Sequence, residues 1–364
     1  MMTRSPRYGR KLDDFEVGAT YPHPWEVTID AGTVALFQAS FLDATPTYAS
    51  AAFARQLGLR DRPIHPLLLM NLGLSFSVHD VSEQAIAHLA YLDIRFPHAC
   101  FAGDTVTASS RVLGVKPTSA GDKGVVHVRT IVDNQDGLTV CAFERKALVR
   151  AGALEGRPEA PFSYAQPDAG ALQRAPVELD RLSGPPSRRG GFAGFFDDFT
   201  EGDVIGHHVG KTVGDSEHMQ LTLLMRNSHP LHFDEGYCRE GSSFTGTRVV
   251  YGGLVFGFVA SLASRDVTGN VLWDLGYDDG AHPSGVAAGD TLYAASKVLS
   301  TRPRNAHTGE VTFRLVGLKN ERPEAVLEAG GDLFAPELGK SREARIASKV
   351  FEISRTVLML RRPG

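Results

Sequence analysis

The stretch RNSHPLHFDEGYC, residues 226–238, gathers two histidines, an asparagine and an acid around one proline. Proline fixes the local backbone, so the polar groups before it can present side chains outside a regular hydrogen-bond ladder. An imidazole that works as a general acid or base needs a water within reach and a second polar group to orient that water. His232 and Asn227, five positions apart around a turn, supply both. The structural alternative is that Asn227 caps a turn or helix and that His229 and His232 are surface residues.

The same loop has a spacing that metal sites use. His229, His232 and Asp234 form an HxxHxD pattern. A zinc or iron site needs ligands that converge, and an internal copy of this segment has residues that are not ordinary zinc ligands. These residues are Thr45, Tyr48 and Ser50. We therefore predict that no metal is bound and keep the metal site as an alternative.

Paired glycines open the apolar stretch VVYGGLVFGF, residues 249–258. Gly252 or Gly253 at a helix start leaves backbone N–H groups unpaired, and such groups stabilise an oxyanion or a thioester carbonyl. Tight packing of the helix against a sheet is the structural alternative. The corresponding place in the first copy is Pro66, which lacks one donor. This difference favours the second copy as the catalytic half, with Tyr251 and Gly253 in its substrate pocket.

The chain contains two copies of one fold. KLDDFEVGATY at 11–21 and GFFDDFTEGDVIG at 194–206 share Asp-Asp-Phe at a shift of 184 residues. The same shift places Asp43 on Asn227 and Tyr48 on His232, and HLAYLDIRFPH matches DLGYDDGAHPS further along the chain. Matches that run in the same order over most of each half indicate a tandem duplication.

Each copy has the same order of elements: a short amphipathic opening, a polar loop, an apolar helix of about four turns, and alternating strand-like runs. This order predicts an α+β fold in which an antiparallel sheet wraps a central helix in each copy. We place an N-terminal half at 1–152 and a C-terminal catalytic half at 191–364. The segment 153–190 between them is rich in proline, glycine and alanine, which predicts a linker.

Charge and cysteine content narrow the function classes. The 364 residues carry 38 basic and 42 acidic side chains, a formal charge of −4, so no basic field is available to hold nucleic acid or an anionic membrane. Three scattered cysteines without a CxxC pair argue against a disulfide framework or a zinc module. The apolar stretches are too short to cross a bilayer, and the first residues lack the apolar core of a signal peptide. We expect a cytoplasmic protein whose ligand is a small polar metabolite.

NSHPLHFD, followed by VVYGGLV and AAGDTL, resembles the MaoC-type, R-specific enoyl-CoA hydratases of the hot dog fold, whose signature runs Gly-Asp-x-Asn-Pro-Leu-His. The resemblance covers both halves and implies a double hot dog. Within that superfamily the two divergent halves are most similar to the mesaconyl-CoA hydratases. The sequence departs from the signature, because the family's aspartate is Asn227 and its asparagine is His229, while its histidine is kept as His232. The first half keeps Asp43 but has Tyr48 in place of the histidine.

The resemblance implies reversible addition of water across the 2,3-double bond of an enoyl-CoA thioester, with mesaconyl-CoA as the expected substrate. His232 is then the principal acid–base residue, Asn227 orients water or imidazole, and the helix start at Gly252 stabilises the thioester oxygen. No cofactor is expected beyond the coenzyme A of the substrate. The alternatives are another short-chain R-specific hydratase, a hot dog thioesterase that uses Asp43, and a non-catalytic acyl-CoA-binding protein.

The resemblance also leads to expectations for the rest of the pocket and for assembly. The distal carboxylate of mesaconyl-CoA needs a cation, and Arg226, Arg60 and Arg62 are candidates because they lie beside the two loops in the sequence. We place His229 in the substrate-binding wall, with Asp43 and Tyr48 from the first copy. We expect a homo-oligomer, a dimer of double hot dogs or larger.

Overall fold

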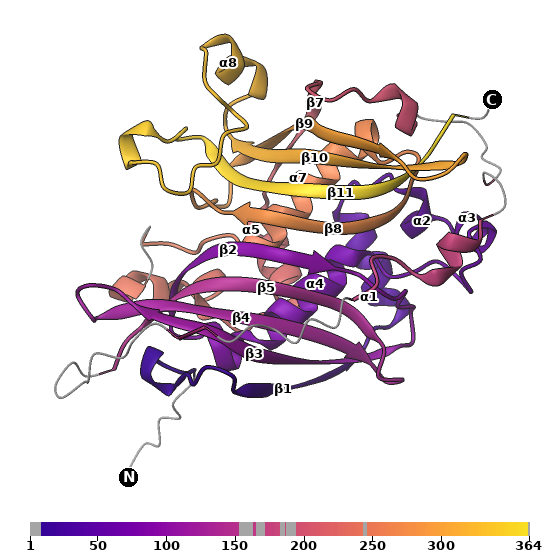
Figure 1. Cartoon of the computed structure of the whole chain (residues 1–364). Coiled ribbons are helices and arrows are strands. Elements are labelled where there is room, and N and C mark those ends of the chain that lie inside the picture. The colour runs from indigo at the N-terminus through magenta and orange to yellow at the C-terminus, as the bar shows by residue number, and fades with distance from the viewer. Residues whose placement is uncertain are drawn as a thin grey trace.

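The structure is a computed structural model that describes residues 9–152, 163–164, 172–182, 186, 194–242 and 246–362. Its described strands form one antiparallel sheet of eleven strands (Figure 1). The strands are β1 (Thr20–Thr28), β2 (Ala85–Arg95), β3 (Thr105–Pro117), β4 (Lys123–Asn134), β5 (Thr139–Arg150), β6 (Ser163–Tyr164), β7 (Val204–Thr212), β8 (Val271–Ala281), β9 (Thr291–Pro303), β10 (Thr308–Lys319) and β11 (Lys349–Leu360). The sheet order is β1-β3-β4-β5-β2-β8-β11-β10-β9-β7, with β6 beside β3, so the second half mirrors the first.

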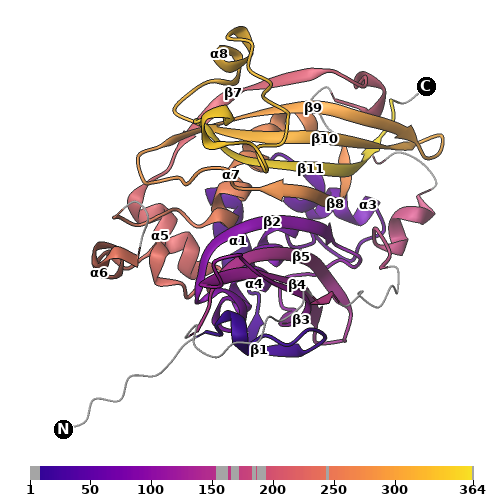
Figure 2. The same cartoon turned by 60° about the vertical axis from the view of Figure 1, so that its left-hand side comes forward.

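The two halves meet at the pair β2 and β8, which lie side by side at the centre of the molecule in Figures 1 and 2. Tyr91 faces Gly280 and Ile94 faces Tyr277 across this antiparallel seam. Because the seam is a continuation of the sheet, residues of one half lie next to the helices and loops of the other.

One long helix of each half lies against the inner face of its sheet. The helices are α1 (Ala31–Ser40), α2 (Pro46–Ala49), α3 (Ala51–Gln56), α4 (Pro66–Phe76), α5 (Asp215–Leu224), α6 (Glu235–Tyr237), α7 (Gly252–Val267) and α8 (Pro323–Glu328). All residues of α4 are buried, as is nearly every residue of α7. A helix that is apolar on all sides is a core helix, so burial of α4 and α7 between sheet and loops is what their sequences require.

Short 3-10 and π turns complete the described elements. They are η1 (Leu12–Asp14), η2 (Val78–Ser82), η3 (Val177–Arg181), η4 (Phe196–Asp198), η5 (Pro230–His232), η6 (Cys238–Ser242) and η7 (Arg342–Ala344). The turn η5 has Pro230 at its first position, where the fixed backbone of proline suits a helical turn. His229 is the N-cap of this turn and His232 is its last residue, and both His229 and the preceding Asn227 are buried.

The internal duplication predicted from the sequence is confirmed element by element. Helix α1 begins at Ala31 and α5 at Asp215, the expected shift of 184 residues. Helix α4 begins at Pro66 and α7 at Gly252, so these two residues do occupy corresponding helix starts. The α+β class, with an antiparallel sheet wrapped around a central helix in each copy, is also confirmed.

The predicted linker 153–190 lies largely outside the described residues. Its described parts contact both halves, since Gln173 donates to the Pro97 carbonyl and Arg174 pairs with Glu310 at 3.0 Å. The bounds of the two halves and of the linker stay a prediction.

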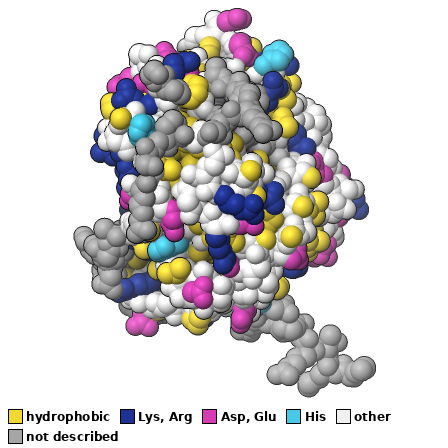
Figure 3. Space-filling model, turned by 90° about the vertical axis from the view of Figure 1, so that its right-hand side faces the viewer, with side chains coloured by type: hydrophobic (Ala, Val, Ile, Leu, Met, Phe, Trp, Pro, Cys, Tyr) yellow, Lys and Arg dark blue, Asp and Glu magenta, His cyan; other side chains and the backbone are white. Residues whose placement is uncertain are grey.

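The described part of the chain shows how apolar helices, surface charges and cysteines are distributed. Within it, no helix is both long and apolar enough to cross a membrane. Basic and acidic side chains are interspersed on the face shown in Figure 3. Cys100, Cys141 and Cys238 are buried thiols.

Candidate active site

Two adjoining cavities lie where the halves meet, one of about 130 Å³ and one of about 700 Å³. Strand β2 of the first half forms one side of both cavities. The polar loop and the start of α7 in the second half form the other side. The residues that line both cavities are Ile86, Ala87, His88, Leu231, His232 and Gly252.

His232 is held with one ring nitrogen committed and the other available. Its Nδ1 lies 2.8 Å from the Val249 carbonyl oxygen. A carbonyl only accepts, so Nδ1 carries the proton and Nε2 is the acceptor nitrogen of the neutral ring. Burial, reinforced by the nearby His229, lowers the pKa of His232 to about 3. The imidazole is therefore neutral near pH 7 and can accept a proton.

Asn227 and His229 hold the loop that carries His232. The Asn227 carboxamide oxygen accepts from the His229 backbone N–H at 2.9 Å. Nδ1 of His229 accepts from the Leu231 N–H at 3.2 Å, and burial lowers the pKa of His229 to about 4. His229 is only 9% exposed, so it is not the surface residue of the structural alternative. The geometry gives Asn227 a turn-forming contact, and its role in orienting water stays a prediction.

The start of α7 presents backbone donors to the same cavity. Tyr251 is the N-cap, and its carbonyl accepts from the N–H groups of Leu254 and Val255. The N–H groups of Gly252 and Gly253 precede these first helical bonds, as at any helix start. A Cβ on Gly252 would lie 2.9 Å from His282 Nε2, so glycine lets the helix start approach that ring. Gly253 instead packs against the Asn71 and Tyr251 side chains and does not line either cavity.

The first half contributes a wall that sequence reasoning missed. His88 and Tyr91 on β2 and Arg145 on β5 line the smaller cavity together with Asn227 and His232. A signal for two of them was present, because the match of HLAYLDIRFPH with DLGYDDGAHPS places His88 on Asp274 and Tyr91 on Tyr277. Nothing in the first copy alone shows that its strand faces the loop of the second copy.

Asp43 and Tyr48 lie in a separate, closed cluster and not in the wall of this cavity, which corrects their predicted place. Asp43 Oδ2 is 3.1 Å from His65 Nε2; burial acts to raise the pKa of Asp43, but the contact with His65 holds it below its usual value. The Tyr48 hydroxyl donates to Asp274 Oδ2 at 3.2 Å, and Asp274 pairs with Arg355 at 2.7 Å. The pseudo-symmetry explains this placement, because the first-half loop faces β8 and β11 just as the second-half loop faces β2 and β5.

Known proteins with similar sequences identify the family of this chain. A model of the mesaconyl-CoA hydratase family matches residues 3–328. The chain belongs to the mesaconyl-CoA hydratase family. It is 32% identical to a β-methylmalyl-CoA dehydratase of Chloroflexus aurantiacus, over 88% of this chain and 91% of that protein. It is also 32% identical to a mesaconyl-CoA hydratase of Cereibacter sphaeroides, over 90% and 94% of the two chains.

Solved structures of other proteins have the same architecture as this member of the mesaconyl-CoA hydratase family. A MaoC domain dehydratase of C. aurantiacus superposes with a TM-score of 0.81 at 29% identity, covering 99% of this chain and 100% of the other. A Mycobacterium tuberculosis protein with a double hotdog fold gives a TM-score of 0.69 at 20% identity, covering 96% and 98%. The predicted double hot dog is confirmed.

The arginines suggested by the sequence lie elsewhere in this family member. Arg226 is exposed, with a positive φ of 62° at the end of α5. Arg60 is 65% exposed and pairs with Asp104 at 2.8 Å, while Arg62 bonds Gln38. None of the three lines either cavity. Closeness to the loops along the chain was therefore a poor guide to position in space.

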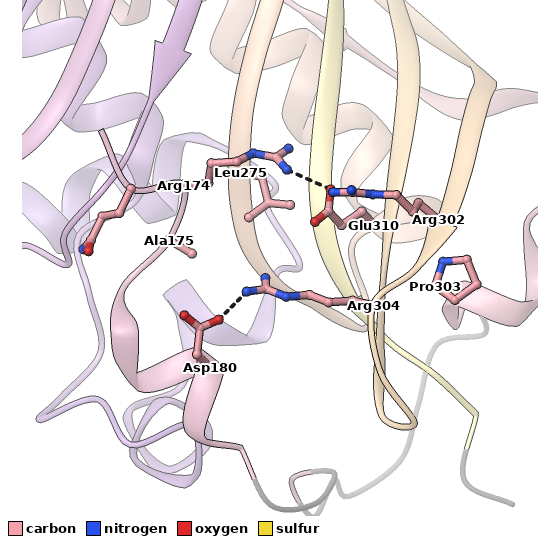
Figure 4. Close-up of a pocket in the computed structure, with 9 residues that line it drawn as sticks. Arg174, Ala175, Asp180, Leu275, Arg302, Pro303, Arg304 and Glu310 are labelled. Atoms are coloured by element: carbon pink, nitrogen blue, oxygen red, sulfur yellow. Dashed lines mark hydrogen bonds and ion pairs between the residues drawn. The ribbon is translucent and has the colours of Figure 1, made fainter. Parts of the chain in front are cut away.

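A third cavity, of about 400 Å³, lies beside the described part of the linker (Figure 4). Arg174 and Arg302 both pair with Glu310, at 3.0 and 2.7 Å, and Arg304 pairs with Asp180. The guanidinium groups of this cavity already have carboxylate partners from the protein itself. It shares no lining residue with the cavities around His232.

The HxxHxD residues of the metal alternative have separate contacts. Asp234 caps α6 by accepting from the Tyr237 N–H at 3.0 Å. The His229 and His232 rings lie 5.8 Å apart between centroids, and each has the backbone partner given above. In the described ranges, no three His, Cys, Asp or Glu side chains are grouped closely enough to hold a metal ion.

Proposed function

We propose that this chain catalyses the reversible hydration of an enoyl-CoA thioester, with mesaconyl-CoA as substrate and β-methylmalyl-CoA as product. The observation that carries the proposal is the pairing of two groups across one cavity. Neutral His232 offers an acceptor nitrogen, and the α7 start at Gly252 offers backbone N–H groups that precede the first helical hydrogen bonds. The names of the relatives, a mesaconyl-CoA hydratase and a β-methylmalyl-CoA dehydratase, support the substrate and product.

The chemistry needs one base and one oxyanion donor. Water attacks C3 while His232 Nε2 takes its proton, and the π electrons move onto the thioester oxygen, which faces the Gly252 N–H. The imidazolium then returns a proton to C2, so that H and OH have been added across the double bond. A pKa of about 3 for His232 disfavours the imidazolium, but the negative charge of the bound enolate raises this pKa during the reaction.

The sizes of the two cavities support a short acyl group on a long carrier. A cavity of roughly 150 Å³ is known to hold a ligand the size of benzene. The cavity of about 130 Å³ beside His232 therefore suits an acyl chain of a few carbons. The adjoining 700 Å³ cavity provides room for the carrier arm next to it. No cofactor beyond the coenzyme A of the substrate is part of the proposal.

The test combines three measurements on mesaconyl-CoA: enoyl absorbance, free CoA thiol and product mass. Loss of absorbance without thiol release, with a product heavier by one water, is the expected result. Thiol release in step with substrate loss would identify a thioesterase instead. Binding of the thioester without any conversion would identify an acyl-CoA-binding protein.

Two further properties belong to the proposal. We expect a homo-oligomer, a dimer of double hot dogs or larger, which sedimentation at several concentrations measures. We also expect a cytoplasmic location, because the buried thiols Cys100, Cys141 and Cys238 suit a reducing compartment.

A further inference from the structure

Two arginines hold equivalent positions in the two halves. Arg145 on β5 lies opposite Tyr91 on β2. Arg355 on β11 lies opposite Tyr277 on β8 in the same register. The two guanidinium groups are therefore pseudo-symmetric, one beside the open cavity and one in the closed cluster.

The charge of Arg355 is matched within the protein. Its Nε lies 2.7 Å from Asp274 Oδ1, and both side chains are almost fully buried. The carboxylate raises the pKa of Arg355 against the effect of burial. This pair occupies the strand positions that correspond to His88 and Arg145 beside the cavity of the other half.

Arg145 is equally buried but has no such carboxylate. Its guanidinium bonds the hydroxyls of Ser77 at 2.7 Å and Ser82 at 3.2 Å, and among the described residues no Asp or Glu forms an ion pair with it. The residue at the Asp274 position is His88, whose pKa is held well below its usual value by burial, so it is neutral. Burial lowers the pKa of Arg145 itself to about 10.

A buried guanidinium without an anion is unfavourable, because it loses hydration and gains no ion pair. Arg145 is only 2% exposed, and it lines the small cavity together with His232 and Tyr251. Its Nε has no partner in the described residues and remains available as a donor. The missing anion therefore fits best as part of a ligand in this cavity.

We propose that Arg145 binds the distal carboxylate of a dicarboxylic acyl-CoA in the 130 Å³ cavity, in the place that Asp274 takes beside Arg355. This inference rests on the proposed function and deepens it, because it assigns the substrate class to one residue. A guanidinium recognises a carboxylate through paired N–H donors. A neutral acyl chain leaves the buried charge unmatched, so a site built this way rejects fatty enoyl-CoA.

The experiment compares binding of two saturated, unreactive thioesters by calorimetry: succinyl-CoA, which has a distal carboxylate, and butyryl-CoA, which does not. The wild type is expected to prefer succinyl-CoA, and Arg145→Met is expected to reduce that preference by about 10- to 100-fold, the usual effect of a hydrogen-bonded charge. Arg55→Gln is the matched control, since Arg55 is 60% exposed and pairs with Asp61 on the surface.

A second variant tests the proposal even when Arg145→Met does not fold. His88→Asp places a carboxylate where the other half has Asp274, so it should pair with Arg145 and abolish the preference for succinyl-CoA. Unchanged succinyl-CoA preference in both variants would overturn the proposal. Loss of the preference in Arg226→Gln instead would assign the carboxylate to Arg226.

Failure of the proposed function is distinguishable from failure of this inference. If the wild type prefers succinyl-CoA through Arg145 but hydrates no enoyl-CoA, the carboxylate site stands and the hydratase proposal falls. The other case is a wild type that hydrates mesaconyl-CoA and an Arg145→Met variant with the same preference for mesaconyl-CoA over the neutral 2-methylcrotonyl-CoA. The hydratase proposal then stands, and the role of Arg145 falls.

Discussion

Gly252 lies directly against the His282 ring, because a Cβ at this position would come 2.9 Å from His282 Nε2. The contact explains why the first turn of α7 begins with glycine beside the cavity. Any side chain there must push either the ring or the helix start, and the helix start carries the N–H groups that face the thioester oxygen in the proposed mechanism.

Gly252→Ala should therefore lower kcat more than it raises KM. A displacement of catalytic donors by about 1 Å typically reduces turnover by roughly 10²-fold, so a loss of about 10- to 100-fold is expected. Steady-state kinetics with mesaconyl-CoA, alongside thermal unfolding, measures it. An unchanged kcat in a normally folded variant would remove the helix start from the mechanism.

His232→Ala should reduce hydratase turnover by a factor on the order of 10² to 10⁴, the usual share of a general acid–base group. His208→Ala is the matched control, because His208 is exposed on β7. Binding of succinyl-CoA to the variant should persist. Equal turnover of the two variants would contradict the role of His232.

Asp43→Asn and Tyr48→Phe should lower stability and leave turnover nearly unchanged. Both residues form hydrogen bonds in the closed cluster, with His65 and Asp274 respectively, and loss of such buried bonds costs about 1 to 3 kcal/mol. This expectation replaces the one from the sequence, in which Asp43 and Tyr48 belong to the substrate-binding wall. Urea unfolding and steady-state kinetics of the same preparations test it. Loss of hydration in a folded Asp43→Asn variant would show instead that Asp43 acts in the mechanism.

Acid should destabilise the protein through its buried neutral histidines. Burial lowers the pKa of His229, His232 and His282 to about 4, 3 and 4. As pH falls, the unfolded chain, whose histidine pKa values are near 6.5, takes up protons before the folded protein does. These histidines therefore do not reduce the free energy of unfolding above about pH 6.5, and they reduce it increasingly as pH drops toward 4. Each histidine contributes on the order of 1 to 2 kcal/mol of this loss by pH 5. Urea unfolding at pH 7.5 and 5 measures the change, and His232→Ala should show a smaller one than His208→Ala. A free energy of unfolding that does not fall at pH 5 would contradict the shifts.

Exhaustive chelation should leave turnover intact, because backbone donors and not a metal ion polarise the thioester in the proposed mechanism. Hydration of mesaconyl-CoA is measured before and after treatment with a strong chelator. Activity that disappears and returns with one divalent ion would revive the HxxHxD interpretation of His229, His232 and Asp234.

The elements of each half could be predicted from local pattern, and the relation between the halves could not. Apolar periodicity and the paired glycines predicted α7 and its start at Gly252. The wall of the cavity depends on the β2–β8 seam, which is a long-range pairing that spacing does not encode. For that reason Arg145 was missed, and three arginines adjacent to the loops in sequence were chosen instead.

The β2–β8 seam also has an evolutionary consequence. In a symmetric homodimer every substitution appears in both centres at once, so neither can change alone. Here one polypeptide carries both copies, and each position can mutate independently of its counterpart. Asp274 could therefore arise without a second carboxylate appearing at His88, so that one centre closed while the other kept its pocket. In this single sheet one centre holds a buried ion pair and the other a cavity.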